Sequence, residues 1–123
     1  MFGVRRCDIS NVKVAQLSEI ADGQMKMVQV GMKEVLLSHV GNQVYATQNR
    51  CQHMGGNLSK GTLKGTVVTC PRHYSQYDVR DGRVLRWTNW PAIVLFFARI
   101  FQPPRPLQTY PVKIEDGNIY VDI

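Results

Sequence analysis

The chain has 123 residues, of which 44% are hydrophobic and 20% are charged, and its formal net charge is +6. This length predicts a single domain over residues 1–123, and the apolar content is too high for a disordered chain. Three cysteines are too few, and odd in number, for a secreted disulfide framework, so we expect free thiols in the cytoplasm. No stretch approaches the roughly 18 apolar residues of a transmembrane segment.

Short apolar runs separated by turn residues predict many short strands. In chain order these runs lie at residues 25–30, 35–37, 44–46, 67–69, 77–79, 84–85, 110–114 and 119–121. Gly41-Asn42, Asp81-Gly82 and Asp116-Gly117 each stand between two runs, which favours hairpins at these positions. Strands at this spacing are typical of an antiparallel sandwich or barrel, so the predicted class is all-β.

One segment departs from this pattern. Residues 90–101 are almost continuously apolar, Asn89 is a candidate N-cap, and Pro91 would lie in the first helical turn. We therefore predict a helical insert over about residues 88–102, too short to span a bilayer. A helix that is apolar all round needs cover on more than one side. Packing on the sandwich, self-association, contact with a partner and contact with a membrane surface all remain open.

Two short motifs combine cysteine with histidine. They are Cys51-Gln52-His53 and Cys70-Pro71-Arg72-His73, with sixteen residues between His53 and Cys70. Each motif follows a predicted strand, so two loops could close on one site. Two thiolates and two imidazoles suit either a tetrahedral zinc ion or a [2Fe–2S] cluster. Structural zinc sites usually pair like ligands, so the mixed pairs favour a cluster in which each loop serves both irons.

The two motifs, with Gly55-Gly56 following the first, resemble those of the Rieske family, and the resemblance extends over most of the chain. It implies a Rieske β-sandwich with cluster-binding loops at one tip, over about residues 50–78. Cys51 and Cys70 would then bind one iron, and His53 and His73 would bind the other. The proline-rich residues 103–106 would form a third loop over the cluster.

The resemblance also implies a function. The chain has no extra cysteine in either motif, unlike the respiratory Rieske subunits, so it is most similar to the Rieske ferredoxins. Such a protein carries one electron between a protein donor and a protein acceptor, and it is not an enzyme by itself. Two alternatives remain open, namely an assembly module similar to the small subunit of nitrite reductase and a structural zinc module.

Ser75 and Tyr77 follow the second motif. They match positions at which high-potential Rieske proteins place hydroxyl groups, and hydrogen bonds to cluster sulfur favour the reduced state. Ordinary roles in a turn and in strand packing would explain the two residues equally well. On the first interpretation, we expect a reduction potential in the middle of the Rieske range, above that of a typical oxygenase ferredoxin.

Acidic residues are missing from the middle of the sequence. Residues 35–77 contain no Asp or Glu, and they contain four basic residues, which are Arg50, Lys60, Lys64 and Arg72. This is either an ordinary solvated surface or an electropositive face that steers a partner with an acidic docking surface. No basic run or aromatic stacking set points to nucleic acid. His39 lies far from both motifs in sequence, so we expect it to be structural.

Overall fold

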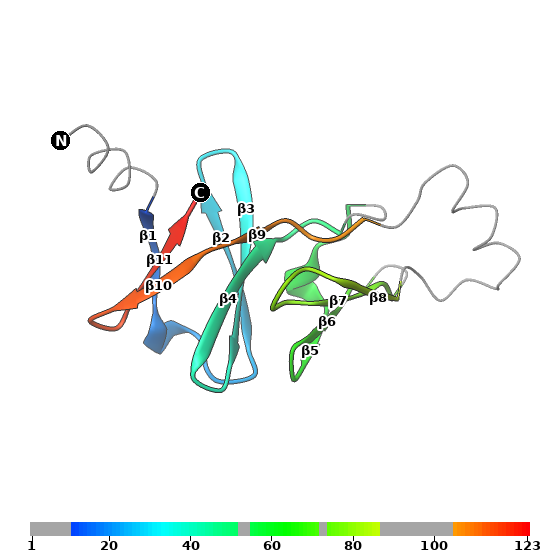
Figure 1. Ribbon diagram of the computed structural model, residues 1–123, viewed down its shortest axis with the longest axis horizontal. Helices are drawn as coiled ribbons and strands as arrows, with labels where there is room; N and C mark the ends of the chain where they lie inside the picture. The colour runs from blue at the N-terminus through cyan, green and yellow to red at the C-terminus, as the bar shows by residue number, and fades with distance from the viewer. Residues whose placement is uncertain (1–10, 52–54, 72–73, 87–104) are drawn as a thin grey trace, which may run out of the picture.

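The protein folds into three antiparallel sheets that follow one another across the molecule (Figure 1). The computed structural model describes residues 11–51, 55–71, 74–86 and 105–123. The first sheet has the order β1 (Asn11–Gln16), β11 (Asn118–Asp122), β10 (Val112–Glu115). The second has the order β2 (Met25–Val30), β3 (Lys33–Val40), β4 (Gln43–Gln48), β9 (Thr109–Tyr110).

The third sheet has the order β5 (Thr62–Lys64), β6 (Val67–Thr69), β7 (Gln76–Asp78), β8 (Val84–Arg86). Helical structure in the described part of the chain is limited to two 3-10 turns, η1 (Leu17–Glu19) and η2 (Leu58–Lys60). The all-β prediction is therefore confirmed, while the predicted helical insert at 88–102 lies outside the described residues. No helix among the residues described is long and apolar enough to cross a membrane.

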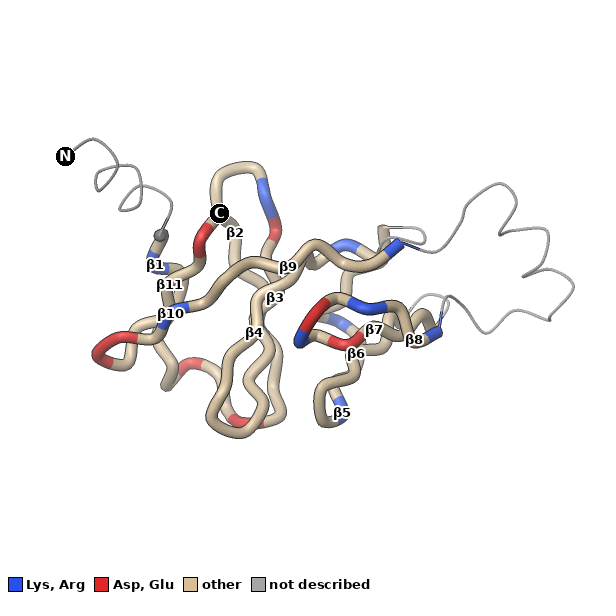
Figure 2. The backbone as a smooth tube through the Cα atoms, in the orientation of Figure 1, with Lys and Arg blue, Asp and Glu red and all other residues tan. Residues whose placement is uncertain are grey.

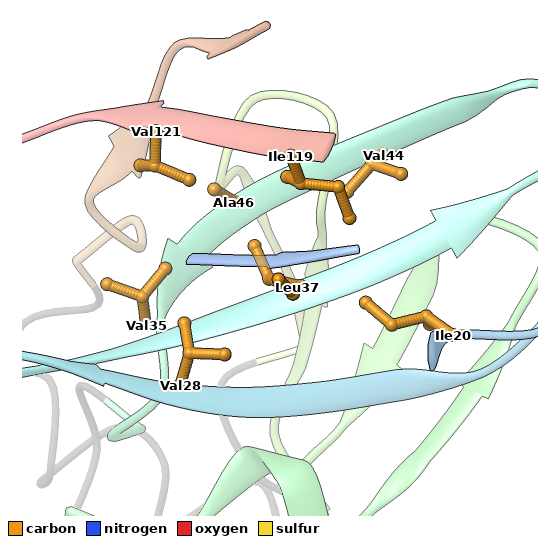
Figure 3. Packing of buried hydrophobic residues seen from close by; sticks show 9 residues of the cluster. Ile20, Val28, Val35, Leu37, Val44, Ala46, Ile119 and Val121 are labelled. Atoms are coloured by element: carbon orange, nitrogen blue, oxygen red, sulfur yellow. The ribbon is translucent and has the colours of Figure 1, made fainter. Parts of the chain in front are cut away.

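Strand β3 lies at the centre of the fold because it is buried on both faces. Successive side chains of a strand point to opposite faces. Val35 and Leu37 therefore pack into the core between the first and second sheets, where Ile119 and Val121 of β11 meet them (Figure 3). Leu36 points the other way, into a second core against the third sheet. This double burial explains the continuous apolar run that the sequence shows at β3.

The predicted hairpins form where the turn residues indicated. Val40 pairs with Gln43 across Gly41-Asn42, and Glu115 pairs with Asn118 across Asp116-Gly117. Asp116 and Gly117 have φ values of 54° and 75°, the positive values that a two-residue type I′ turn requires. Asp81-Gly82 likewise lies in the turn between β7 and β8. These local turns fix the register of the strands, and through it the face on which each side chain lies.

Candidate metal centre

The two motif cysteines lie together in the second core. Cys51 follows β4 and Cys70 directly follows β6, and only 4% and 2% of their surfaces are exposed. Neither forms a disulfide. They share this core with a set of buried apolar side chains, namely Leu36, Leu58, Val68, Tyr77, Val79 and Leu107. Two buried thiols in one core, one from each loop and neither in a disulfide, fit a cofactor that is held by thiolates from two loops.

The two cysteine loops have the same backbone hydrogen bonds. In the first, the Cys51 N–H donates to the Gly56 carbonyl at 2.8 Å, and the Gly55 N–H donates to the Cys51 carbonyl at 2.8 Å. In the second, the Cys70 N–H donates to the carbonyl of Ser75, five residues on, at 2.8 Å. The Tyr74 N–H donates back to the Cys70 carbonyl at 3.1 Å. The two loops therefore share one pattern of backbone hydrogen bonds around their cysteines, which the sequence motifs did not reveal.

Tyr77 brings a hydroxyl group to one of the cysteines. Its side chain is fully buried in the second core, and its hydroxyl lies 3.2 Å from the Cys51 Sγ. If this sulfur is a metal-bound thiolate it has no proton to give, so the tyrosine donates. Ser75 is also fully buried, and its backbone carbonyl accepts the Cys70 hydrogen bond described above. The two interpretations of Tyr77 are therefore compatible, because its ring packs in the core while its hydroxyl reaches sulfur.

A buried amide holds the first loop in place. Asn49 is fully buried, and its Nδ2 donates to Glu34 Oε1 at 3.0 Å and to Asn57 Oδ1 at 2.8 Å. Its Oδ1 accepts from the Ser59 N–H at 3.0 Å. The amide thus ties the start of the loop to β3 and to the residues that follow it. Nothing in the sequence motif identified Asn49, because its partners are distant in the sequence.

Arg50 has an acidic neighbour that the sequence pattern concealed. Its Nε lies 3.0 Å from Glu34 Oε1, its Nη2 lies 3.1 Å from Glu34 Oε2, and its Nη1 donates to the Gly55 carbonyl at 3.3 Å. Hydrogen bonds from Arg50 and Asn49 lower the pKa of Glu34. The pairing of β3 with β4 brings Glu34 next to the acid-free stretch. Arg50 therefore braces the first loop, and much of its charge is compensated.

The β7–β8 turn is organised by a buried carboxylate. The side chain of Asp78 is 3% exposed, and it accepts from Arg80 Nη2 at 2.7 Å and from Arg83 Nη2 at 3.4 Å. The Arg80 hydrogen bond is the main cause that lowers the pKa of Asp78 to about 2. The Gly82 N–H donates to the Asp78 carbonyl, and the Gly82 carbonyl accepts from the Leu107 N–H. The turn therefore anchors the returning chain beside the cysteines.

Several predicted site residues are not placed. His53, Arg72 and His73 lie outside the described residues, as does the part of the predicted third loop before residue 105. Lys60 and Lys64 are exposed, in η2 and at the end of β5. Among the residues that are described, no three His, Cys, Asp or Glu side chains come together as a metal site. His39 is structural as predicted, since its Nδ1 lies 2.7 Å from the Ile20 carbonyl.

Comparison with known proteins decides between the metals that the ligand types left open. The family model described as the Rieske [2Fe-2S] domain matches residues 10–111. The chain belongs to the Rieske [2Fe–2S] family. Its cofactor is accordingly a Rieske-type [2Fe–2S] cluster, and the buried thiols of the second core fit that cofactor.

The relatives of this Rieske protein are ferredoxin components. It is 33% identical, over 91% of its length and 94% of the relative, to the ferredoxin component of the naphthalene 1,2-dioxygenase system of Pseudomonas putida. It is 32% identical to the biphenyl 2,3-dioxygenase ferredoxin component of Rhodococcus jostii (strain RHA1), over 90% of its length and 91% of the relative. The predicted role as an electron carrier between proteins, and not a catalyst, is therefore confirmed.

Solved structures give the same result for the fold. The ferredoxin of carbazole 1,9a-dioxygenase from Nocardioides aromaticivorans IC177 matches 91% of the chain with a TM-score of 0.75 and 25% identity, and 96% of that structure is covered. A complex of reduced oxygenase and oxidized ferredoxin in carbazole 1,9a-dioxygenase contains a chain with a TM-score of 0.73 and 29% identity. That match covers 92% of this protein and 93% of the other chain.

Proposed function

We propose that this Rieske ferredoxin serves an oxygenase system for aromatic substrates and passes its electron to the terminal oxygenase. The two buried cysteines, on loops with the same backbone hydrogen bonds and with the Tyr77 hydroxyl beside one of them, support the electron-carrying part of this proposal. The named systems of its relatives supply the class of partner, since ferredoxins of naphthalene, biphenyl and carbazole systems all match the chain. The cytoplasm, where such a carrier would find reduced cofactors, is the proposed location.

We further propose that Cys51 and Cys70 hold one iron, and that His53 and His73 hold the other. Rieske clusters use two cysteines and two histidines in this way, and the chain offers both pairs in its two motifs. When bound, the cluster supplies a one-electron redox couple. The protein supplies the rest. The second core excludes water around the two thiols, the matched loops fix their directions, and the Tyr77 hydroxyl offers a hydrogen bond to sulfur.

Charge supports a partner with an acidic docking surface. Residues 50–105 contain nine of the fifteen Lys and Arg residues but only two of the nine Asp and Glu residues. One of these two acids, Asp78, pairs with Arg80 and Arg83, and this half of the sequence keeps an excess of basic residues. Figure 2 shows several blue segments along the third sheet, with two red segments among them, and the other red segments spread over the first and second sheets. Such an asymmetric field orients the protein so that its cysteine loops meet an acidic partner first.

The acidic partner would meet Lys60, Lys64 and Arg72, the last of which lies outside the described residues, while Arg50 already interacts with Glu34. The apolar segment at residues 90–101 lies within the same basic half of the sequence, and we keep it as a proposed contact for self-association, for the partner or for a membrane surface.

The proposal is tested by mixing the reduced protein with purified terminal oxygenases of naphthalene, biphenyl and carbazole systems in a stopped-flow instrument. We expect at least one oxygenase to reoxidise the protein in a saturable reaction that slows as ionic strength rises, because salt screens the attraction. Reoxidation by all three at only the background rate would refute the proposed partner class.

The ligand assignment has a separate test. Alanine at each of the four proposed ligands should abolish the binding of iron and acid-labile sulfide, which the wild type should hold at about two of each per chain. His39→Ala is the matched control, because this third histidine bonds to Ile20 and should leave the metal content unchanged. A full metal content in any of the four variants would remove that residue from the ligand set.

A further inference from the structure

One tyrosine has a backbone conformation that suits glycine. Tyr74 has φ +61°, in the left-handed region that a bulky side chain rarely adopts. The corresponding position of the first loop is Gly55, with φ +69°, and both residues donate their N–H to the carbonyl of the preceding cysteine. The loop thus requires this conformation in both motifs, but only the first uses the residue that adopts it without strain.

The core does not gain from the Tyr74 side chain. The residue is 52% exposed, whereas Tyr77, three positions later, is fully buried in the second core. About half of its surface therefore faces solvent, and it is not one of the residues of the second core. Residues with a strained backbone conformation that packing does not compensate are found preferentially at functional sites. The exposed ring of Tyr74 is consequently a candidate for an interaction outside the folded chain.

We propose that Tyr74 is an aromatic anchor that inserts into an apolar pocket with an acidic rim on the terminal oxygenase, an inference that rests on the proposed function. Tyr74 directly follows His73 in the sequence, so a partner that covers its ring is bound at the second cysteine loop. Tyrosine is enriched among the residues that dominate binding energy, because its large rigid ring loses little conformational freedom when bound. The excess of basic residues in this half of the sequence favours the acidic rim.

This proposal makes stability and binding respond in opposite directions. Replacing Tyr74 with glycine removes the backbone strain, which offsets the greater freedom of glycine in the unfolded chain. We therefore expect a melting temperature no lower than that of the wild type. The same change removes the ring, so the affinity for the oxygenase should fall by about 10-fold. Tyr74→Phe keeps the ring and should bind nearly as well as the wild type.

The experiment compares these variants by titration against the one oxygenase of the three-member panel that the wild type reduces fastest. Melting temperature, reduction potential and visible spectrum are measured on the same preparations, and the last two should not change. Asp116→Gly is the matched control, because Asp116 also has a positive φ, 54°, but lies in the β10–β11 turn at the opposite end of the molecule (Figure 1). It should leave the affinity unchanged.

The outcomes separate this inference from the proposed function. If the wild type reduces an oxygenase and Tyr74→Gly binds it equally well, the anchor is refuted while the proposed function stands. If Tyr74→Gly lowers the melting temperature by more than about 4 °C, the ring is structural and the inference is overturned. If no oxygenase is reduced by the wild type, the proposed function fails and the anchor fails with it.

Discussion

The hydroxyl of Tyr77 should raise the reduction potential of the protein, and Tyr77→Phe removes it with little other change. The ring stays in the second core, where it is fully buried, and only the contact of 3.2 Å with the Cys51 Sγ is lost. Because a reduced cluster carries more negative charge on sulfur, a donor at this distance stabilises the reduced state more than the oxidised state. The variant should therefore have a lower potential.

The size of the shift follows from the strength of the bond. A hydrogen bond to a charged group contributes about 1.5–3 kcal/mol, compared with about 1 kcal/mol for a neutral pair. One added electron therefore strengthens the Tyr77 bond by about 0.5–2 kcal/mol. For a one-electron couple, 59 mV corresponds to a tenfold change in the equilibrium constant, so the potential should fall by about 20–90 mV.

Protein-film voltammetry at fixed pH measures this shift directly. Tyr120→Phe is a suitable control, since Tyr120 lies on β11 in the first sheet, away from both cysteine loops, and its loss of a hydroxyl should leave the potential unchanged. Circular dichroism and the visible spectrum check that each variant is folded and holds its cluster. An unchanged potential in an intact Tyr77→Phe protein would show that the hydroxyl does not tune the cluster.

Two further predictions concern the β7–β8 turn. Asp78→Asn should lower the free energy of unfolding at pH 7 by about 1–2 kcal/mol, less than the full pKa shift implies because the paired arginines are exposed. The pKa of Asp78, about 2, lies below the ordinary value of 3.8, so the ionised side chain stabilises the fold fully above about pH 4. The difference in unfolding free energy between wild type and variant should therefore vanish as the pH falls towards 2. Urea unfolding of both proteins at the same cluster content measures this difference. A difference that persists at low pH would show that the Asp78 carboxylate is not its source. Gly82→Ala should lower the free energy of unfolding by at least about 2 kcal/mol, because the new Cβ would lie 2.2 Å from the Leu107 carbonyl oxygen. Gly23→Ala should lower it by only about 1 kcal/mol, because Gly23 has a similar φ but no atom within 4 Å of the added Cβ. Equal losses in the two alanine variants, compared by thermal unfolding, would refute the role of the Leu107 contact.

The local features of this protein could be predicted from its sequence. The turn pairs at Gly41-Asn42 and Asp116-Gly117 determine hairpins because a two-residue turn needs backbone conformations that few residues adopt. The Cys-x-His and Cys-x-x-His motifs identified the cofactor class because ligand type and spacing are themselves sequence properties. His39 was correctly expected to be structural.

Other features depend on which strands pair, and the sequence alone could not supply them. Glu34 pairs with Arg50 because antiparallel pairing of β3 and β4 brings together residues that are sixteen positions apart. For the same reason, an acid-free stretch of sequence is not an acid-free surface.

The tertiary structure also decided how the site is built. Packing of the third sheet against β3 carries the Tyr77 hydroxyl to a cysteine 26 positions earlier, and it shows that one side chain both fills the core and reaches sulfur. The shared hydrogen bonds of the two cysteine loops place Tyr74 where Gly55 stands in the first loop. Sequence determined which groups are available, because composition and turns are local properties, whereas strand pairing decided which of them meet, because contact depends on the whole fold.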